Sequence, residues 1–168
     1  MKRNEILKEA EKHFFAAMGS GWAAGVKGTP VLEMPGYEKI VYQCNDIRVV
    51  DCWGISDQGK SEGTTRIWHF KEPIWNPIWV MHYGGFYPKE VIPFLKEALM
   101  MSYKRSEFNG GRGPSWYSNN SGVQYFNNSD PVIYFSQFNG SERICSSKGL
   151  ESGDREVGQH DFWGMALI

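Results

Sequence analysis

The sequence predicts an α+β fold, in which a mainly antiparallel sheet packs against two principal helices. Three observations lead to this fold class. Two segments place apolar residues at helical spacing, and several shorter segments alternate apolar and polar residues as strands do. A helix, a hairpin and two further strands also follow one another twice along the chain, which indicates a duplicated helix-plus-four-strands unit.

The first predicted helix covers residues 5–18. Asn4 precedes it and is a suitable N-cap residue, and Gly19 and Gly21 are expected to end it. The apolar face of this helix is formed by Ile6, Leu7, Ala10, Phe14, Ala17 and Met18. Charged side chains lie outside this face, so we expect the apolar face to pack against the core.

A β-hairpin is predicted next, with strands over residues 38–44 and 47–53 and a tight turn at Asn45-Asp46. In that register, one face of the hairpin carries Ile40, Tyr42, Cys44, Ile47, Val49, Asp51 and Trp53. All of these residues except Asp51 are apolar or aromatic, so Asp51 is the exception on this face.

Two further strands are predicted over residues 65–70 and 74–83, where Pro77 indicates a bulge, a sheet edge or a late strand start. The second helix is expected to begin at Pro88 and to end near Tyr103. A polar stretch follows this helix. The remaining strands are expected at residues 123–126, 132–138, 143–146 and 161–168.

The second half of the chain repeats pieces of the first. Gly63-Thr64-Thr65-Arg66-Ile67 returns as Gly140-Ser141-Glu142-Arg143-Ile144, and Trp79-Val80-Met81 returns as Trp163-Gly164-Met165. We therefore predict a single domain over residues 1–168, built from internal repeats over residues 4–87 and 88–168.

Composition restricts the classes of function. The net charge of the 168 residues is -1, which argues against a nucleic-acid partner, and the apolar runs are too short for a membrane-spanning helix. The three cysteines are scattered, so we expect neither a disulfide framework nor a zinc site formed by them. We expect a cytoplasmic protein without a cofactor and without a membrane partner, and a homodimer is compatible with this composition.

Five segments of the chain carry a family resemblance: Asp51-Cys52-Trp53, residues 77–85, residues 94–99, Arg112-Gly113-Pro114 and residues 138–144. Three of these segments contain the motifs Trp-x-Met-x-Tyr, Arg-Gly-Pro and Gly-x-Glu-x-Ile. In these segments the chain resembles a family of bacterial domains of unknown function, whose members stand alone or are attached to helix-turn-helix regulators. The resemblance implies a sensing or interaction role and supplies no catalytic residue or cofactor. The chain departs from the family pattern at Thr65, where it lacks the acidic residue that is kept at Glu142.

Asp51 is the first candidate for a functional residue. A carboxylate on an apolar strand face must be paired or hydrogen-bonded, and such a group can act as an acid, a base or a ligand anchor. Two structural interpretations stay open. Asp51 pairs with an arginine such as Arg66 or Arg143, or a shift of register turns it toward water.

Arg112 is the second candidate. It lies in the loop over residues 109–114, whose glycines let backbone amides approach an anion, and its guanidinium can bind a carboxylate or phosphate. Trp116 and Tyr117 follow it and can stack on a planar ligand. The alternative is that Arg112 fixes the loop in place by pairing with an acidic residue such as Glu142.

The aromatic residues of the predicted strands can line an apolar pocket or fill the core. The candidate ligand-binding residues are therefore Asp51, Trp53, Trp79, Tyr83, Arg112, Trp116 and Glu142. A metal site is not expected, because no recognisable ligand spacing joins His69, His82, His160 and Asp161.

Three functions fit these residues. The first is a small-molecule-binding or sensor-like domain without catalysis. The second is a small hydrolase or isomerase that uses Asp51 as general base and Arg112 or a histidine as electrostatic partner, which requires these groups to share one cleft. The third is a protein-interaction module that uses exposed aromatic residues around Trp116 and Tyr117.

Overall fold

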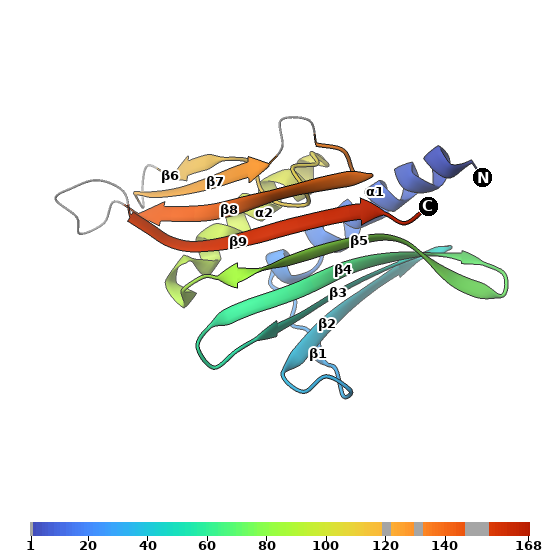
Figure 1. The fold of residues 1–168 in the computed structure, drawn as a ribbon, viewed down its shortest axis with the longest axis horizontal. Helices are drawn as coiled ribbons and strands as arrows, with labels where there is room; N and C mark the ends of the chain where they lie inside the picture. Colours follow the sequence, from blue (N-terminus) through green and yellow to red (C-terminus); the bar gives the residue numbers. More distant parts are fainter. Residues whose placement is uncertain (1, 119–121, 130–132, 147–154) are drawn as a thin grey trace.

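The computed structural model describes residues 2–118, 122–129, 133–146 and 155–168. Over these residues it contains two α-helices that lie on one side of a nine-stranded antiparallel sheet, which confirms the α+β fold class (Figure 1). The helices are α1 (Arg3–Gly19) and α2 (Ile92–Arg105), with short 3-10 turns η1 (Trp22–Ala24) and η2 (Lys89–Val91). The strands are β1 (Thr29–Pro30), β2 (Tyr37–Cys44), β3 (Ile47–Ile55), β4 (Lys60–Lys71), β5 (Ile74–Phe86), β6 (Trp116–Ser118), β7 (Val123–Ser129), β8 (Gln137–Ser146) and β9 (Arg155–Ala166).

The strand order in the sheet is β1-β2-β3-β4-β5-β9-β8-β7-β6. Each half of the chain therefore forms a meander of neighbouring strands, and the two meanders join where β9 pairs with β5. α2 connects the two meanders, and both helices cover the same face of the sheet and leave the other face open (Figure 1).

The two repeated sequence motifs behave differently in this sheet. Gly63 on β4 lies opposite Tyr83, and Gly140 on β8 lies opposite Phe162, and in both places the aromatic ring occupies the space of a glycine side chain. Trp79 on β5 is fully buried under the helices. Trp163 on β9 lies beside His82 on the outer face of the sheet and is 47% exposed. The Trp-x-Met match thus relates residues on different faces, and the duplicated unit stays a prediction.

Both helices begin at different residues from those predicted. The first helix starts before Asn4, and the backbone N–H of Lys2 donates to the carboxylate of Glu5, so the prediction that Asn4 caps the helix was wrong. Pro88 precedes the 3-10 turn η2, and α2 starts at Ile92. The next residue along the chain is a proline, which fits the first turn of a helix because that turn needs no N–H donor.

The predicted hairpin register of β2 and β3 is confirmed. Cys44 pairs with Ile47 across the Asn45-Asp46 turn, and Ile40 pairs with Asp51. Asn45 has a φ of 50°, a backbone conformation that asparagine tolerates better than most residues. In consequence, Asp51 lies on the face of the sheet that the helices cover.

Of the three interpretations of Pro77, a bulge, a sheet edge or a late strand start, the structure shows the bulge. Ile67 on β4 pairs with Trp79, but the next residue, Trp68, pairs with Pro77, so Ile78 is the extra residue. As a result, both Ile78 and Trp79 are buried at this point of the sheet.

The predicted strands at residues 132–138 and 143–146 are not two elements. The structure has one strand, β8, whose first residue is Gln137, while Val132 lies outside the described residues. Gly140 lies inside β8 and does not end a strand. A glycine is needed there because the ring of Phe162 occupies the space that a side chain would fill. The last predicted strand is also longer, since β9 starts at Arg155.

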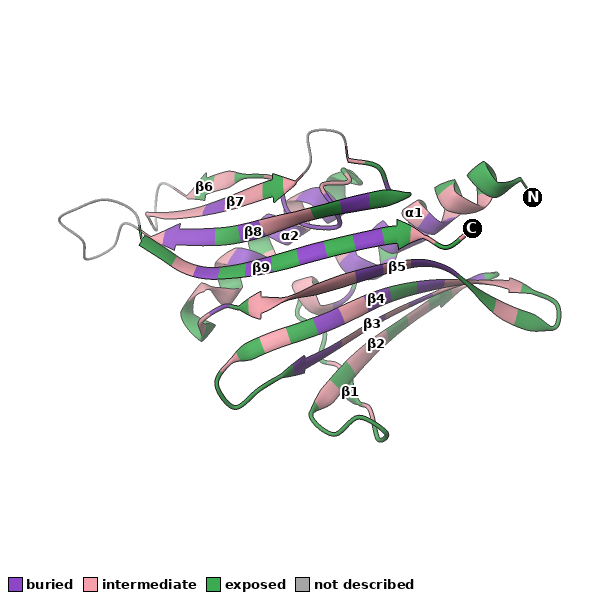
Figure 2. Ribbon diagram, viewed as in Figure 1, coloured by how far each residue is buried: buried purple, intermediate pink, exposed green. Residues whose placement is uncertain are grey.

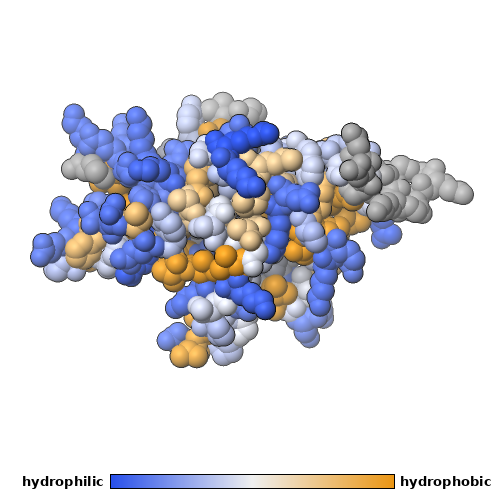
Figure 3. Space-filling view, turned by 180° about the vertical axis from the view of Figure 1, so that it is seen from behind, coloured by the Kyte–Doolittle hydropathy of each residue, from blue (hydrophilic) through white to orange (hydrophobic). Residues whose placement is uncertain are grey.

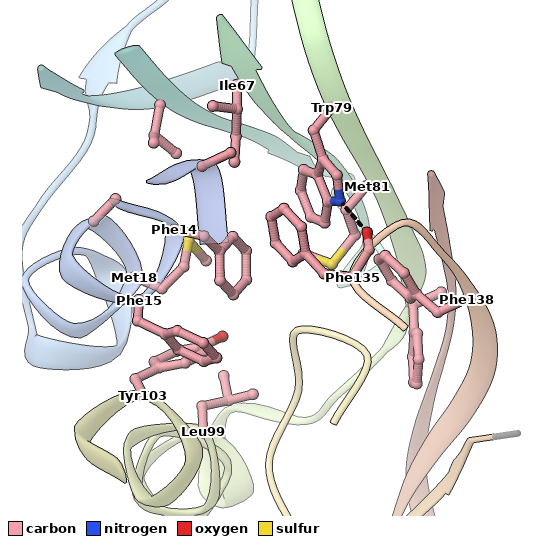
Figure 4. Packing of buried hydrophobic residues seen from close by; sticks show 14 of the residues in the cluster. Phe14, Phe15, Met18, Ile67, Trp79, Met81, Leu99, Tyr103, Phe135 and Phe138 are labelled. Carbon is pink, nitrogen blue, oxygen red and sulfur yellow. Dashed lines mark hydrogen bonds between the residues drawn. The ribbon is translucent and has the colours of Figure 1, made fainter. Parts of the chain in front are cut away.

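The main core lies between the helices and the inner face of the sheet. Figure 2 shows buried residues alternating with more exposed ones along β3 and β9, as a sheet with one covered face requires. At the centre of the core, the ring of Trp79 stacks on that of Phe135 at a centroid distance of 4.7 Å, and its indole N–H donates to the Phe135 carbonyl (Figure 4). Phe14 of α1 packs against the same two rings.

The surface adds two general observations. On the side where the helices lie, apolar residues gather in a strip across the middle of the molecule (Figure 3). None of the helices in the described part of the chain is long and apolar enough to cross a membrane.

Candidate functional site

A cavity of about 170 Å³ lies between the helices and the inner face of the sheet. Its apolar walls are formed by Met18, Trp22, Ala23, Trp53, Ile55, Ile92, Leu95 and Leu99. The cavity reaches the surface beside Ile55 and Lys89, which are both exposed. Met18 and Leu99, which Figure 4 shows in the main core, also line the cavity, so the cavity adjoins the core.

Polar side chains from separate parts of the chain meet at this cavity. The larger ones are Asp51 of β3, Tyr83 of β5, Tyr87, Tyr103 of α2, Arg112 and His160 of β9. Asp51 and Arg112 are 8% and 4% exposed, respectively. The sequence could not establish whether these two residues share a pocket, and the structure brings them together.

Asp51 is held by two hydroxyl donors. Thr65 Oγ1 and Tyr83 Oη both donate to Asp51 Oδ1, at 2.8 and 2.9 Å. Arg66 and Arg143, which we considered as partners from the sequence, are exposed and take no part in the hydrogen bonds that hold this carboxylate among the described residues. The hydroxyls therefore take the place of an arginine partner.

The pKa of Asp51 is raised, chiefly because burial disfavours the charged carboxylate. The hydrogen bonds from Thr65 and Tyr83 oppose this effect, as does the positive charge of Arg112. Asp51 is thus a buried carboxyl group whose environment favours proton exchange at a higher pH than that of an ordinary aspartate.

Arg112 reaches the cavity from a closely packed loop. Gly111, with a φ of 73°, leaves no space for a side chain between Met81 and Phe14. The guanidinium Nη2 donates to Glu142 Oε1, and the guanidinium carbon lies 5.4 Å from the centre of the Tyr83 ring. The structural interpretation of Arg112, in which it pairs with Glu142, is therefore confirmed, and the same side chain also lines the cavity.

Glu142 is the anchor behind Arg112. It is fully buried on β8, and it accepts a second hydrogen bond from the hydroxyl of Tyr125. Tyr125 in turn accepts a hydrogen bond from the backbone N–H of Gly113, at 3.1 Å. Two side chains and a loop amide thereby fix the position of Arg112 at the cavity wall.

Asp51 and Arg112 each have polar side-chain atoms without a hydrogen-bond partner among the described residues. Asp51 uses Oδ1 for both of its bonds, and Arg112 uses Nη2 for Glu142. Four buried side-chain atoms also lack a hydrogen-bond partner in the described part of the chain, namely Tyr87 Oη, Arg112 Nε, Asn127 Oδ1 and His160 Nδ1. Asp51 Oδ2 and Arg112 Nη1 take part in none of the hydrogen bonds of the described residues, and both side chains line the cavity, so these two atoms are the candidates for contact with a bound molecule.

His160 adds an uncharged group to the site. Burial, and then the nearby Arg112, lower the pKa of its imidazole to about 4, although Glu142 opposes this shift. Its Nε2 lies 3.0 Å from Ser61 Oγ, and its Nδ1 lies 3.7 Å from Glu142 Oε1. The sequence singled out His160 only as a metal candidate, because nothing in its neighbours indicates a cavity position.

The remaining predicted site residues divide between the cavity and other places. Trp53 and Tyr83 line the cavity, whereas Trp79 belongs to the core beside it. Trp116 stacks on Phe94 of α2 at a centroid distance of 4.8 Å and does not line the cavity. The alternation of aromatic residues along a strand could not distinguish cavity walls from core, since both lie on the covered face.

Three aromatic residues of the cavity were missed. They are Trp22, Tyr87 and Tyr103. Trp22 lies in the 3-10 turn η1 and Tyr87 follows the end of β5, so neither carries a helical or strand periodicity. Tyr103 was predicted only as the end of a helix, and its hydroxyl donates to the Gly111 carbonyl at 3.0 Å.

The described residues contain no group of three or more His, Cys, Asp or Glu side chains arranged to hold a metal ion. The histidines are dispersed: His82 stacks on Trp163 at 4.4 Å on the outer face, whereas His160 faces the cavity.

A second, more open hollow of about 370 Å³ lies on the outer face of the sheet. Glu62, His82, Asp161 and Trp163 contribute to its lining, and its floor includes Gly63 and Gly140. This hollow is larger than the inner cavity, but it lacks the buried pair of opposite charges. We therefore regard the inner cavity as the candidate functional site.

Comparisons with known proteins identify no relative of this chain. No family model, no curated protein and no solved structure matches it. The resemblance to a bacterial domain family of unknown function accordingly stays a prediction.

Proposed function

We propose that this protein binds a small molecule in the cavity between the sheet and the helices, as a ligand-binding or sensor-like domain. The observation that carries the proposal is the meeting of Asp51 and Arg112 at one otherwise apolar cavity. Each side chain is more than nine-tenths buried and lines the cavity, and Asp51 Oδ2 and Arg112 Nη1 take part in none of the hydrogen bonds of the described residues. Burying such groups costs free energy, and a bound molecule that satisfies them recovers part of that cost.

The dimensions and walls of the cavity support the same proposal. Its volume of about 170 Å³ is close to that of an apolar cavity known to hold benzene, which is about 150 Å³. Trp22, Trp53 and Tyr83 offer flat apolar surfaces beside the two charged groups. Apolar walls with a few polar groups are typical of small-molecule sites.

A second candidate function is catalysis by a small hydrolase or isomerase. It required Asp51 and Arg112 to share one cleft, and they do. The raised pKa of Asp51 suits a general base, and the guanidinium of Arg112 at the same cavity can stabilise a developing negative charge. If this function holds, the bound molecule is converted by the parent protein, and Asp51→Asn abolishes the conversion.

The proposed setting is the cytoplasm. Cys44 and Cys52 are free thiols in the structure, as expected of a protein kept in a reducing compartment. The sensor-like role also agrees with the resemblance to domains attached to helix-turn-helix regulators.

A thermal-shift screen against metabolites tests the binding function, with Asp51→Asn as the diagnostic variant. A ligand at about 100 times its dissociation constant adds roughly 2.7 kcal/mol to the free energy of unfolding. At about 2–4 °C per kcal/mol for a chain of this size, the parent protein should show a clear rise in Tm.

We expect Asp51→Asn to lose the ligand-induced shift and to keep the Tm of the free protein nearly unchanged. Asparagine retains an oxygen for Thr65 and Tyr83 but places an amide nitrogen at the Oδ2 position. The matched control is Asp46→Asn in the exposed turn at the other end of β3, which should retain the shift. Equal losses of binding and of stability in Asp51→Asn would make Asp51 a structural residue and refute the proposal.

A further inference from the structure

We propose that the ligand, whose binding is the function proposed above, is an uncharged single-ring compound with adjacent hydrogen-bond donor and acceptor atoms, such as a primary amide or lactam. Its donor binds Asp51 Oδ2 and its acceptor binds Arg112 Nη1, while its ring lies against the aromatic walls of the cavity.

These two atoms are complementary to such a group. Asp51 already accepts two hydroxyl bonds at Oδ1, and its ionised Oδ2 can only accept another. Arg112 Nη1 can only donate. Both atoms belong to one cavity, and the positive charge of Arg112 acts on Asp51. An amide carries an N–H donor and a carbonyl acceptor side by side, so one small group can satisfy both atoms.

The charges at the cavity disfavour ligands with a net charge. The guanidinium of Arg112 is already paired with Glu142, His160 adds no positive charge at neutral pH, and Lys89 at the mouth of the cavity is opposite in charge to Asp51. A carboxylate ligand would therefore approach Asp51 and Glu142, whereas an ammonium ligand would approach Arg112 and Lys89. Both arrangements place like charges together in a largely buried site, which weakens binding strongly.

The size of the cavity limits the rest of the molecule. A volume of about 170 Å³ exceeds that of the benzene-binding cavity, about 150 Å³, by little more than a short substituent. The remaining walls are mainly apolar and include Leu95, Leu99 and Trp53. A single ring with one amide-sized polar group therefore fits both the volume and the lining.

Isothermal titration calorimetry with four probes tests the inference. The probes are benzamide, benzoate, benzylamine and toluene, which share a ring and differ in charge and hydrogen bonding. In mildly alkaline buffer, the parent protein should bind benzamide at least about tenfold more tightly than any of the other three.

The variant Asp51→Asn gives the test a second arm. It replaces the Oδ2 acceptor by an amide donor, so the cavity then presents donors from both residues. We expect the preference to reverse, with benzamide weakened by about tenfold or more and benzoate strengthened. Asp46→Asn should keep the parent's preference. A merely structural Asp51 would change the affinities for all four probes in parallel.

Each outcome bears on the inference. Tighter binding of benzoate or benzylamine by the parent protein overturns the uncharged class and leaves the binding function standing. If the parent protein prefers toluene, the polar atoms do not select the ligand. That result also overturns the inference and leaves the binding function standing. If none of the four probes binds, the inference fails, and the function proposed above is then decided by the metabolite screen alone.

Discussion

Asp51 and Arg112 are expensive residues to bury, and the structure compensates them unequally. Arg112 has a full countercharge in Glu142, whereas Asp51 has only two hydroxyl donors, so one negative charge stays without a partner of its own. Such an imbalance lowers stability in a purely structural cluster. At a binding site it provides an acceptor that is ready for a ligand without rearrangement of the protein.

His160 should make the stability of the protein depend on pH. Its folded pKa of about 4 lies below the ordinary value of 6.5, so the unfolded state takes up a proton first as the pH falls. The contribution is fully present above pH 6.5 and is lost progressively as the pH falls to about 4, by roughly 3 kcal/mol in total.

Urea unfolding at neutral pH and at weakly acid pH checks this dependence. His160→Gln keeps a polar partner for Ser61 and removes the titration, so its unfolding free energy should fall less steeply with acid than that of the parent. His69→Gln, at a histidine outside the cavity, should follow the parent. Identical acid sensitivity of the parent and His160→Gln would show that this imidazole is not held neutral by burial.

At the scale of elements, strand register decides which side chains reach the cavity. The β2–β3 hairpin was predictable because a tight turn fixed the pairing and the apolar residues alternated without interruption. The extent of β8 was not predictable, because a glycine such as Gly140 indicates a turn in the sequence. Only the structure shows that the Phe162 ring occupies its side-chain space. Periodicity likewise identifies a covered face, but it cannot show where that face leaves a cavity.

Gly63 should be required for the position of Tyr83, and hence for binding. A side chain at this position would collide with the Tyr83 ring, whose hydroxyl donates to Asp51. We expect Gly63→Ala to reduce stability by about 1–3 kcal/mol and also to weaken the binding of the first ligand found by the screen.

Gly140→Ala is the matched comparison for this change. It should cost similar stability through its collision with Phe162, yet leave the affinity nearly unchanged, because Phe162 does not line the cavity. Urea unfolding and calorimetric titration of both variants give the two quantities. Unchanged ligand affinity in Gly63→Ala would show that the placement of Tyr83 is not needed for the site.

At the scale of the whole molecule, the site exists because two meanders share one sheet and two helices cover one face. β3, β5 and β9 bring Asp51, Tyr83 and His160 to the same cavity, and the loop after α2 adds Arg112. The sequence predicted the fold class and several of these residues. It could not predict the pairing of β5 with β9, because no turn connects those strands.

A crystal structure of the protein with the first ligand from the thermal-shift screen tests the central claim most directly. We predict that the ligand lies between the inner face of the sheet and the helices, within hydrogen-bond distance of Asp51 Oδ2 and Arg112 Nη1. A ligand seated in the outer hollow beside His82 and Trp163, with the inner cavity unchanged, would contradict the claim that the inner cavity is the functional site.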